Sequence, residues 1–226
     1  MARLTYPRAG EPRPAALPPA ERTVGQLVAE SIRLYGDRFF ASVVLGVPAA
    51  VIVGLGSWLS GWVQVALVLA VGGILCSAAL VFAVLIVHPR HTSPRALTAA
   101  LATGLIVFVP ALVSRLTVFP GIYLVAIVWM AATIFAVPAL LVEGVGPLQA
   151  FRRSFRLARA DIVHAVGGLA TFIIAIVLTS LVLTFLLRGF SDQSLRAAAM
   201  LALLVVTPLF FIGSALLYVD QSARVK

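Results

Sequence analysis

Six long apolar runs, separated by short polar segments, restrict what this chain can fold into more than any other feature. A helix needs about 20 apolar residues to cross the hydrocarbon core of a membrane, and each run reaches this length without an acidic residue in its central part. The runs are residues 39–58, 62–87, 97–118, 121–142, 162–187 and 195–219. We therefore predict an all-α polytopic membrane protein whose six transmembrane helices form three hairpins.

The overall composition excludes a water-soluble domain. Hydrophobic residues make up 62% of the 226 residues and charged residues only 11%, which would leave a soluble domain of this size with a large apolar surface in water. The single Cys76 lies inside the second apolar run. The sequence therefore offers no disulfide framework and no thiolate metal cluster, and we expect this thiol to pack as a small apolar side chain.

The distribution of basic residues predicts the orientation of the chain. Six crossings place both termini on the same side, and fourteen of the seventeen Lys and Arg residues fall in segments on that side. Only Arg115, Arg188 and Arg196 fall on the other side. Because loops rich in Lys and Arg stay in the cytoplasm, we predict a multi-pass protein of the cell membrane with both termini cytoplasmic. The net charge of +9 is spread over membrane-flanking segments, which favours anionic lipids of the cytoplasmic leaflet over nucleic acid as partners.

Residues 1–22 differ from the rest of the chain. They contain five prolines among Arg, Ala and Glu, a composition that cannot bury a core. We predict a disordered cytoplasmic tail over residues 1–22 and a six-helix membrane domain over residues 23–226. A cleavable signal peptide is not expected, since the first apolar run starts near residue 39 and reaches full membrane length.

A segment near residues 23–37 has the pattern of an amphipathic helix lying in the plane of the membrane surface. Thr23 and Gln26 have the spacing of a capping box, which begins helices. Polar residues occupy one side of the helical wheel. The opposite, apolar side contains Val24, Leu27, Val28, Ile32, Leu34, Tyr35 and Phe39.

A second segment, near residues 147–161, has a similar pattern and a higher charge. Pro147 suits the first position of a helix, and Leu157 lies where it can contact the helix bundle. The predicted apolar stripe contains Leu148, Phe151, Phe155, Ala158 and Ile162. The predicted contacts to lipid headgroups are Arg152, Arg153, Arg156 and Arg159. Attraction to anionic lipid of about 1 kcal/mol for each arginine would hold this helix flat on the membrane.

Four strings of the sequence resemble one known family. They are TVGQLVAESIRLYGDRFF at 23–40, FPGIYLVAIVW at 119–129, VPALLVEGVGPLQAFRRSFRLARADI at 137–162 and ALLYVDQSAR at 215–224. The chain resembles the membrane domain that precedes the catalytic domain in some glycerophosphoryl diester phosphodiesterases, and that also occurs alone in many bacterial, especially actinobacterial, membrane proteins. The resemblance implies a six-span helical fold without established chemistry of its own. The chain departs from the family pattern in two places. Gln221 and Ser222 follow Asp220, where the family usually has Leu-Arg. Ile162 or Val163 stands at the start of the fifth span, where the family commonly has a Trp.

The sequence contains no catalytic constellation that we can identify. The phosphodiesterase activity of the related fusion proteins needs a soluble barrel, and no segment is long or polar enough to form one. Zinc-protease HExxH and serine-hydrolase GxSxG motifs are absent. His88 and His91 have the spacing of metal ligands, but Pro89 prevents a regular helix from presenting both. We therefore expect no enzyme, no catalytic residue, no metal site and no cofactor.

Two acidic residues at the ends of apolar runs leave alternatives open. Glu143 precedes the arginine-rich helix, where it is either part of a proton or cation path or the partner of Arg152 or Arg153. We favour the ion pair, because ionisable side chains at span ends reach water easily. The same alternatives apply to Asp220, with the same arginines as candidate partners.

The sequence leaves two classes of function. The first is a scaffold or accessory subunit that works with a membrane-protein partner or a second copy of the chain. The alternative is a small transporter or lipid-handling protein, with Glu143 or Asp220 as its coupling carboxylate. Its site would lie among the helices interrupted by proline, which are those with Pro48, Pro110, Pro138 and Pro208.

Overall fold

The computed structural model describes residues 18–114 and 121–225, and within these ranges the chain is helical and contains no strand. Six segments are long and apolar enough to cross a membrane, which confirms the predicted fold class. They are Phe39–Gly56, Gly61–Val87, Pro94–Ser114, Gly121–Glu143, Ile162–Leu186 and Asp192–Arg224. The sixth segment extends past the predicted run at both ends. Most of the predicted tail, Arg115 and the Phe119–Pro120 turn lie outside the described residues.

Several spans consist of more than one helical element. In chain order the elements are η1 (Pro19–Glu21), α1 (Val24–Asp37), α2 (Phe39–Val43), η2 (Val44–Gly46), α3 (Val47–Trp58), α4 (Gly61–Leu67), η3 (Val68–Gly72), α5 (Gly73–Val87), α6 (Pro94–Ser114), α7 (Gly121–Thr133), α8 (Ala136–Glu143), α9 (Pro147–Ala160), α10 (Ile162–Leu186) and α11 (Asp192–Arg224). The 3-10 turn η1 lies within residues 1–22, the segment predicted to be a disordered tail. Residues 18–22 are therefore ordered, in contrast to that prediction.

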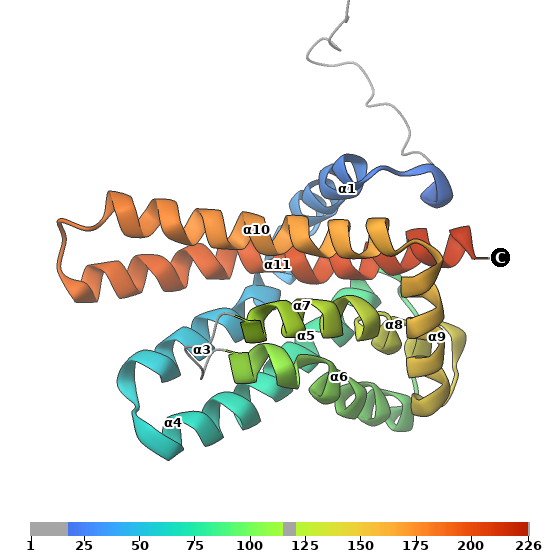
Figure 1. Ribbon diagram of the computed structural model, residues 1–226, viewed down its shortest axis with the longest axis horizontal. Helices are drawn as coiled ribbons and strands as arrows, with labels where there is room; N and C mark the ends of the chain where they lie inside the picture. Colours follow the sequence, from blue (N-terminus) through green and yellow to red (C-terminus); the bar gives the residue numbers. More distant parts are fainter. Residues whose placement is uncertain (1–17, 115–120, 226) are drawn as a thin grey trace, which may run out of the picture.

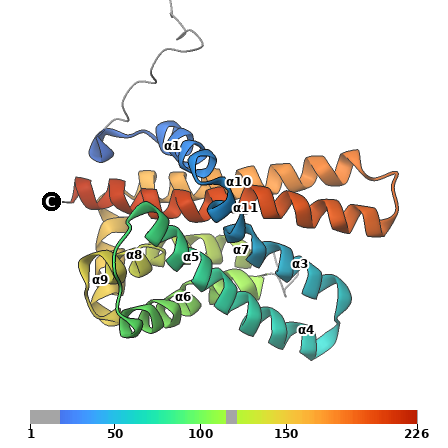
Figure 2. The ribbon, with the colours of Figure 1, turned by 180° about the vertical axis from the view of Figure 1, so that it is seen from behind.

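The long antiparallel hairpin of α10 and α11 divides the molecule (Figure 1). Helix α1 lies on one side of the hairpin, and α3 to α8 lie on the other (Figures 1 and 2). Helix α9 crosses one end of the bundle, where α10 begins and α11 ends. We call this the basic end. In their most apolar stretches, 61% of the residues of α11 are buried but only 11% of those of α10, so α11 is the central helix and α10 faces outward.

Two of the four intramembrane prolines coincide with breaks in their helices. The 3-10 turn η2 ends two residues before Pro48. Helices α7 and α8 are separated by a turn at Ile134, whose carbonyl cannot receive a hydrogen bond from Pro138 because proline has no N–H. Pro110 and Pro208 lie inside continuous helices. The π-helical stretch η3 contains no proline.

Close approaches at two glycines join other elements to α11. A Cβ atom at Gly46 would lie 2.0 Å from the carbonyl oxygen of Leu204. That carbonyl has no helical N–H donor, because Pro208 occupies the donor position four residues later. A Cβ atom at Gly213 would lie 2.2 Å from the Phe172 ring of α10. Glycine at these two positions therefore lets span one and α10 pack directly on α11.

Candidate functional site

Helix α9 is fixed across the basic end through a face of small and apolar residues. Ala150, Ser154 and Leu157 are completely buried. The Ser154 hydroxyl donates a hydrogen bond of 2.7 Å to the carbonyl oxygen of Ala132 in α7. Gly144 has a φ of 71° and ends α8, a conformation that glycine adopts readily. This turn directs the chain from the fourth span into α9.

The face of α9 that packs on the bundle contains Leu157, as predicted, and is separate from the predicted apolar stripe. Of the stripe residues, only Ala158 is buried. Leu148, Phe155 and Ile162 are 66%, 39% and 60% exposed. The small side chains of Ala150 and Ser154 explain this, because they allow a closer helix approach than the larger residues of the stripe. The larger apolar residues are therefore available to a membrane.

Three arginines share the exposed face of α9. Arg152, Arg156 and Arg159 surround Phe155 in a shallow depression. Among the described residues, none of these three guanidinium groups has an ion-pair or hydrogen-bond partner. We call Leu148, Arg152, Phe155, Arg156 and Arg159 the basic face. It combines unpaired positive charge with exposed apolar surface, a combination typical of helices that bind anionic membrane surfaces.

The fourth predicted headgroup contact has a different environment. Arg153 Nε lies 2.9 Å from Glu143 Oε1, which also accepts a hydrogen bond of 2.9 Å from the Tyr218 hydroxyl. The side chains of Arg153 and Glu143 are 20% and 29% exposed. Of the two alternatives for Glu143, the structure has the ion pair with Arg153. This pair joins α8 to α9. The contribution of Tyr218 has no signal in the sequence.

Asp220 is the centre of a second, deeper cluster. Its carboxylate is completely buried and lies 3.2 Å from the Arg22 guanidinium. The prediction that an arginine of α9 pairs with Asp220 is therefore wrong. His164 Nε2 lies 3.9 Å from the other carboxylate oxygen. Arg224 donates a hydrogen bond of 2.7 Å to the main-chain carbonyl of Arg22. The chain before α1 is thus attached to the end of α11.

Asp161 connects the beginning of α10 to the end of α11. Its carboxylate caps α10 by accepting a hydrogen bond of 3.0 Å from the main-chain N–H of His164, and it pairs with Arg224. Gln221 donates a hydrogen bond of 3.1 Å to the Asp161 carbonyl. The His164 N–H, followed by the Arg224 charge, lowers the pKa of the Asp161 carboxyl below its usual value, although partial burial opposes this shift. Asp161 is therefore an anion at neutral pH.

Helix α1 has the predicted capping box, with both hydrogen bonds between Thr23 and Gln26. Its Leu27 is completely buried. A Cβ atom at Gly168 of α10 would lie 3.3 Å from Leu27 and 3.1 Å from Leu217 of α11. Helix α1 therefore docks on the α10–α11 hairpin through part of its predicted apolar face.

Other residues of that face remain uncovered. Ile32 and Phe39 are 52% and 45% exposed. On the polar side, Arg33 lies 3.7 Å from Glu30 and 3.9 Å from Asp37, and all three side chains are partly exposed. Helix α1 thus has one face on the bundle and another toward its surroundings.

The histidines considered as metal ligands are not part of a cluster. His88 is at the C-terminal end of α5 and His91 is exposed. Within the ranges 18–114 and 121–225, no three His, Cys, Asp or Glu side chains lie close enough to hold a metal ion. Cys76 is buried among the spans.

Comparisons with protein-family models, with curated proteins and with solved structures give no match to this chain. The resemblance to the membrane domain of glycerophosphoryl diester phosphodiesterases therefore stays a prediction based on the motifs quoted above.

Proposed function

We propose that this protein is a non-catalytic scaffold or accessory subunit of the cell membrane, with the basic end held against the anionic cytoplasmic leaflet. The basic face of α9 supports this proposal most directly. Its three arginines have no carboxylate partner among the described residues, and phosphate groups of lipids would supply the missing negative charge. The remaining contacts of α9 fix the orientation of this face.

The proposed orientation follows from the positions of the charges. Arg90, Arg95 and the arginines of α9 lie at or near the basic end, whereas Arg188 and Arg196 lie by the turn between α10 and α11. An excess of Arg and Lys marks the cytoplasmic side of a membrane protein. We therefore propose that the basic end and both termini lie on the cytoplasmic side.

The environments of the two carboxylates favour a scaffold over ion-coupled transport. Glu143 is bonded to Arg153 and Tyr218, and Asp220 is paired with Arg22. Neither carboxylate lines the apolar cavity between the spans. A coupling acid needs a polar path to its ion, and both carboxylates instead join elements of the fold.

The exposed surface of α10 supports a role in assembly. Large apolar side chains cover this helix, including Leu178, Leu181 and Phe185, which are 55%, 60% and 62% exposed. Such a surface accommodates lipid, a partner's transmembrane helix or a second copy of the chain. Purification from native membranes followed by mass spectrometry tests this role. A stoichiometric protein partner or a dimer supports it, and a monomer that retains only a solute contradicts it.

The lipid contact is tested by removing two charges from the basic face. The variant Arg152→Ala with Arg156→Ala should lose about 2 kcal/mol of attraction to anionic lipid, at about 1 kcal/mol for each arginine. This corresponds to roughly 30-fold weaker retention of phosphatidylglycerol. Native mass spectrometry of protein released from mixed phosphatidylglycerol and phosphatidylcholine nanodiscs measures the retained lipid.

A matched control removes two positive charges from the opposite end. Arg188→Ala with Arg196→Ala changes the net charge equally, but neither residue belongs to the basic face. We expect this variant to lose less phosphatidylglycerol than the variant of the basic face. Equal losses in the two double variants would show that net charge, and not the basic face, determines lipid retention.

A further inference from the structure

A cavity of about 320 Å³ lies between the α10–α11 hairpin and the other spans. Its walls come from α3, α5, α6, α7, α10 and α11. Ser114 is the last residue of α6, whereas Thr207 is near the middle of α11. The cavity therefore extends from the middle of the spans toward the end opposite the basic end. It is separate from the ion pairs described above.

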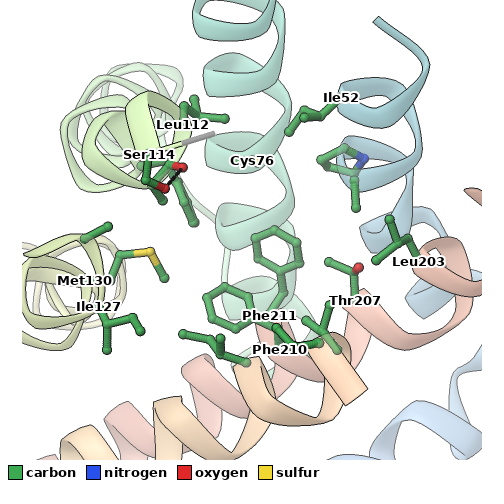
Figure 3. A pocket seen from close by; sticks show the side chains of 18 of the residues that line it. Ile52, Cys76, Leu112, Ser114, Ile127, Met130, Leu203, Thr207, Phe210 and Phe211 are labelled. Carbon is green, nitrogen blue, oxygen red and sulfur yellow. Dashed lines mark hydrogen bonds between the residues drawn. The ribbon is translucent and has the colours of Figure 1, made fainter. Parts of the chain in front are cut away.

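The walls of the cavity are almost entirely apolar. Figure 3 shows Phe210, Phe211 and Met130 around the space, with Thr207 at its edge. The Ser114 hydroxyl donates a hydrogen bond of 2.7 Å to the carbonyl oxygen of Ala111. Thr207 Oγ1 is buried and has no hydrogen-bond partner among the described residues. Since apolar cavities of this kind do not hold water, hydrocarbon suits the space better.

The exposure of the lining residues shows where the cavity opens. Tyr123 of α7 and Val177 of α10 are 44% and 49% exposed, whereas Cys76, Met130 and Phe211 are at most 9% exposed. The opening thus lies between α7 and α10, and the closed side lies against α5 and α11. Both helices at the opening have apolar outer surfaces that face the hydrocarbon of a bilayer. A molecule reaches this opening from the membrane.

We propose that this cavity binds one hydrocarbon chain of a membrane lipid, inserted between α7 and α10. The volume is about twice that of a 150 Å³ apolar cavity that takes up benzene. It is at the lower limit of ligand pockets, about 300 to 1,000 Å³. A single chain therefore fits better than a whole lipid with its headgroup. This site is distinct from the basic face of α9, where the contact is electrostatic.

The position of the site gives the bound chain a structural role. Ile52 of α3, Phe108 of α6 and Ile173 of α10 all line the same space. A chain in the cavity contacts the α10–α11 hairpin and the other spans at once. It therefore fills a gap in packing that would otherwise leave these side chains without neighbours.

The experiment uses the full chain in nanodiscs made with a phosphatidylglycerol that has a diazirine in the middle of one acyl chain. After irradiation, labelled residues are mapped by mass spectrometry. We expect labels on the interior residues Cys76, Met130 or Phe211, which lipid surrounding the protein cannot contact. We also expect labels on Leu124 and Val128, which are 68% and 64% exposed on the outside of α7.

Two substitutions on α7 separate the cavity from the outer surface. Ala126 is 4% exposed and lines the cavity, so Ala126→Phe should abolish interior labelling and leave Val128 labelled. Leu124→Phe adds a ring on the outer side and should not change interior labelling. If Ala126→Phe fails to fold, Ala111→Leu fills the cavity from α6 and should give the same loss.

The outcomes decide between a lipid chain and other occupants. Labels confined to the outer surface of the wild type, or interior labels unaffected by both filling variants, would overturn the proposal. The Thr207→Val variant removes the hydroxyl while keeping the shape of the side chain. It should keep interior labelling if the occupant is hydrocarbon, and a loss of labelling would indicate that binding depends on a polar group.

Discussion

Replacing Asp220 with Asn should detach the segment around Arg22 from the bundle while leaving the six spans folded. The Asp220 side chain is completely buried and that of Arg22 is only 11% exposed. Breaking a buried ion pair costs about 3 to 5 kcal/mol. Because Arg22 precedes α1, its guanidinium can turn into water once the carboxylate is removed. The cost of breaking the Arg22–Asp220 pair then appears as detachment of the η1 turn.

The expected size of the effect follows from the lower end of this range. About 3 kcal/mol, at 1.4 kcal/mol for each tenfold change in an equilibrium constant, increases the detached population on the order of 100-fold. Limited trypsin digestion measures this population, since trypsin cleaves after Arg22 only when the segment leaves its docked position. When docking is fast relative to cleavage, the cleavage rate is proportional to the open population. Mass spectrometry of the fragments gives the rate at this site.

The matched control is Glu30→Gln, which removes a carboxylate from the same region. Glu30 lies 3.7 Å from Arg33, whose side chain is 45% exposed. Exposed pairs contribute at most about 1 kcal/mol, so cleavage after Arg22 should increase by no more than about fivefold. Equal rates in the wild type and the Asp220→Asn variant would refute the assignment of the buried pair as the attachment of this segment.

Two further predictions concern packing and pH. Gly213→Ala should lower the free energy of unfolding by about 1 to 3 kcal/mol, because the new methyl group would lie 2.2 Å from the Phe172 ring. The control Gly36→Ala should not destabilise the protein, because a methyl group at Gly36 would have no atom within 4 Å. Similar melting temperatures for the two variants would contradict this prediction. The lowered pKa of Asp161 means that its carboxylate stabilises the fold at neutral pH and that this contribution is lost as pH falls below about 4. The difference in melting temperature between the wild type and Asp161→Asn should therefore shrink in acid, and a constant difference would disprove the role of the charge.

Helix positions were predictable because the membrane imposes a simple pattern. Apolar runs of sufficient length indicate spans, and the capping residues Thr23 and Gln26 correctly indicate the start of α1. Proline chemistry accounts for the break before Pro138, but it does not predict every break, because Pro110 and Pro208 lie inside continuous helices. The π-helical stretch η3 was not predictable, since its sequence is as apolar as the helices around it.

Contacts between distant residues were less predictable. The wheel of α9 separates its two faces, but it does not show that Ala150 and Ser154 pack inward. That choice depends on how closely α9 approaches α7. Asp220 at a span end indicates that some cation must accompany it, but the sequence does not identify Arg22. The environment of an acid includes residues from any part of the chain, and spacing along one helix does not reveal them.

The contact between Arg22 and Asp220 also has a consequence for synthesis. The two residues are 198 positions apart. At a synthesis rate of about 5 to 20 residues per second, Arg22 is synthesised roughly 10 to 40 s before Asp220. Helix α1 must remain undocked during this interval, while the earlier spans enter the bilayer. Attachment of this segment is thus one of the last events of assembly, and protection of Arg22 would report that the sixth span is in place.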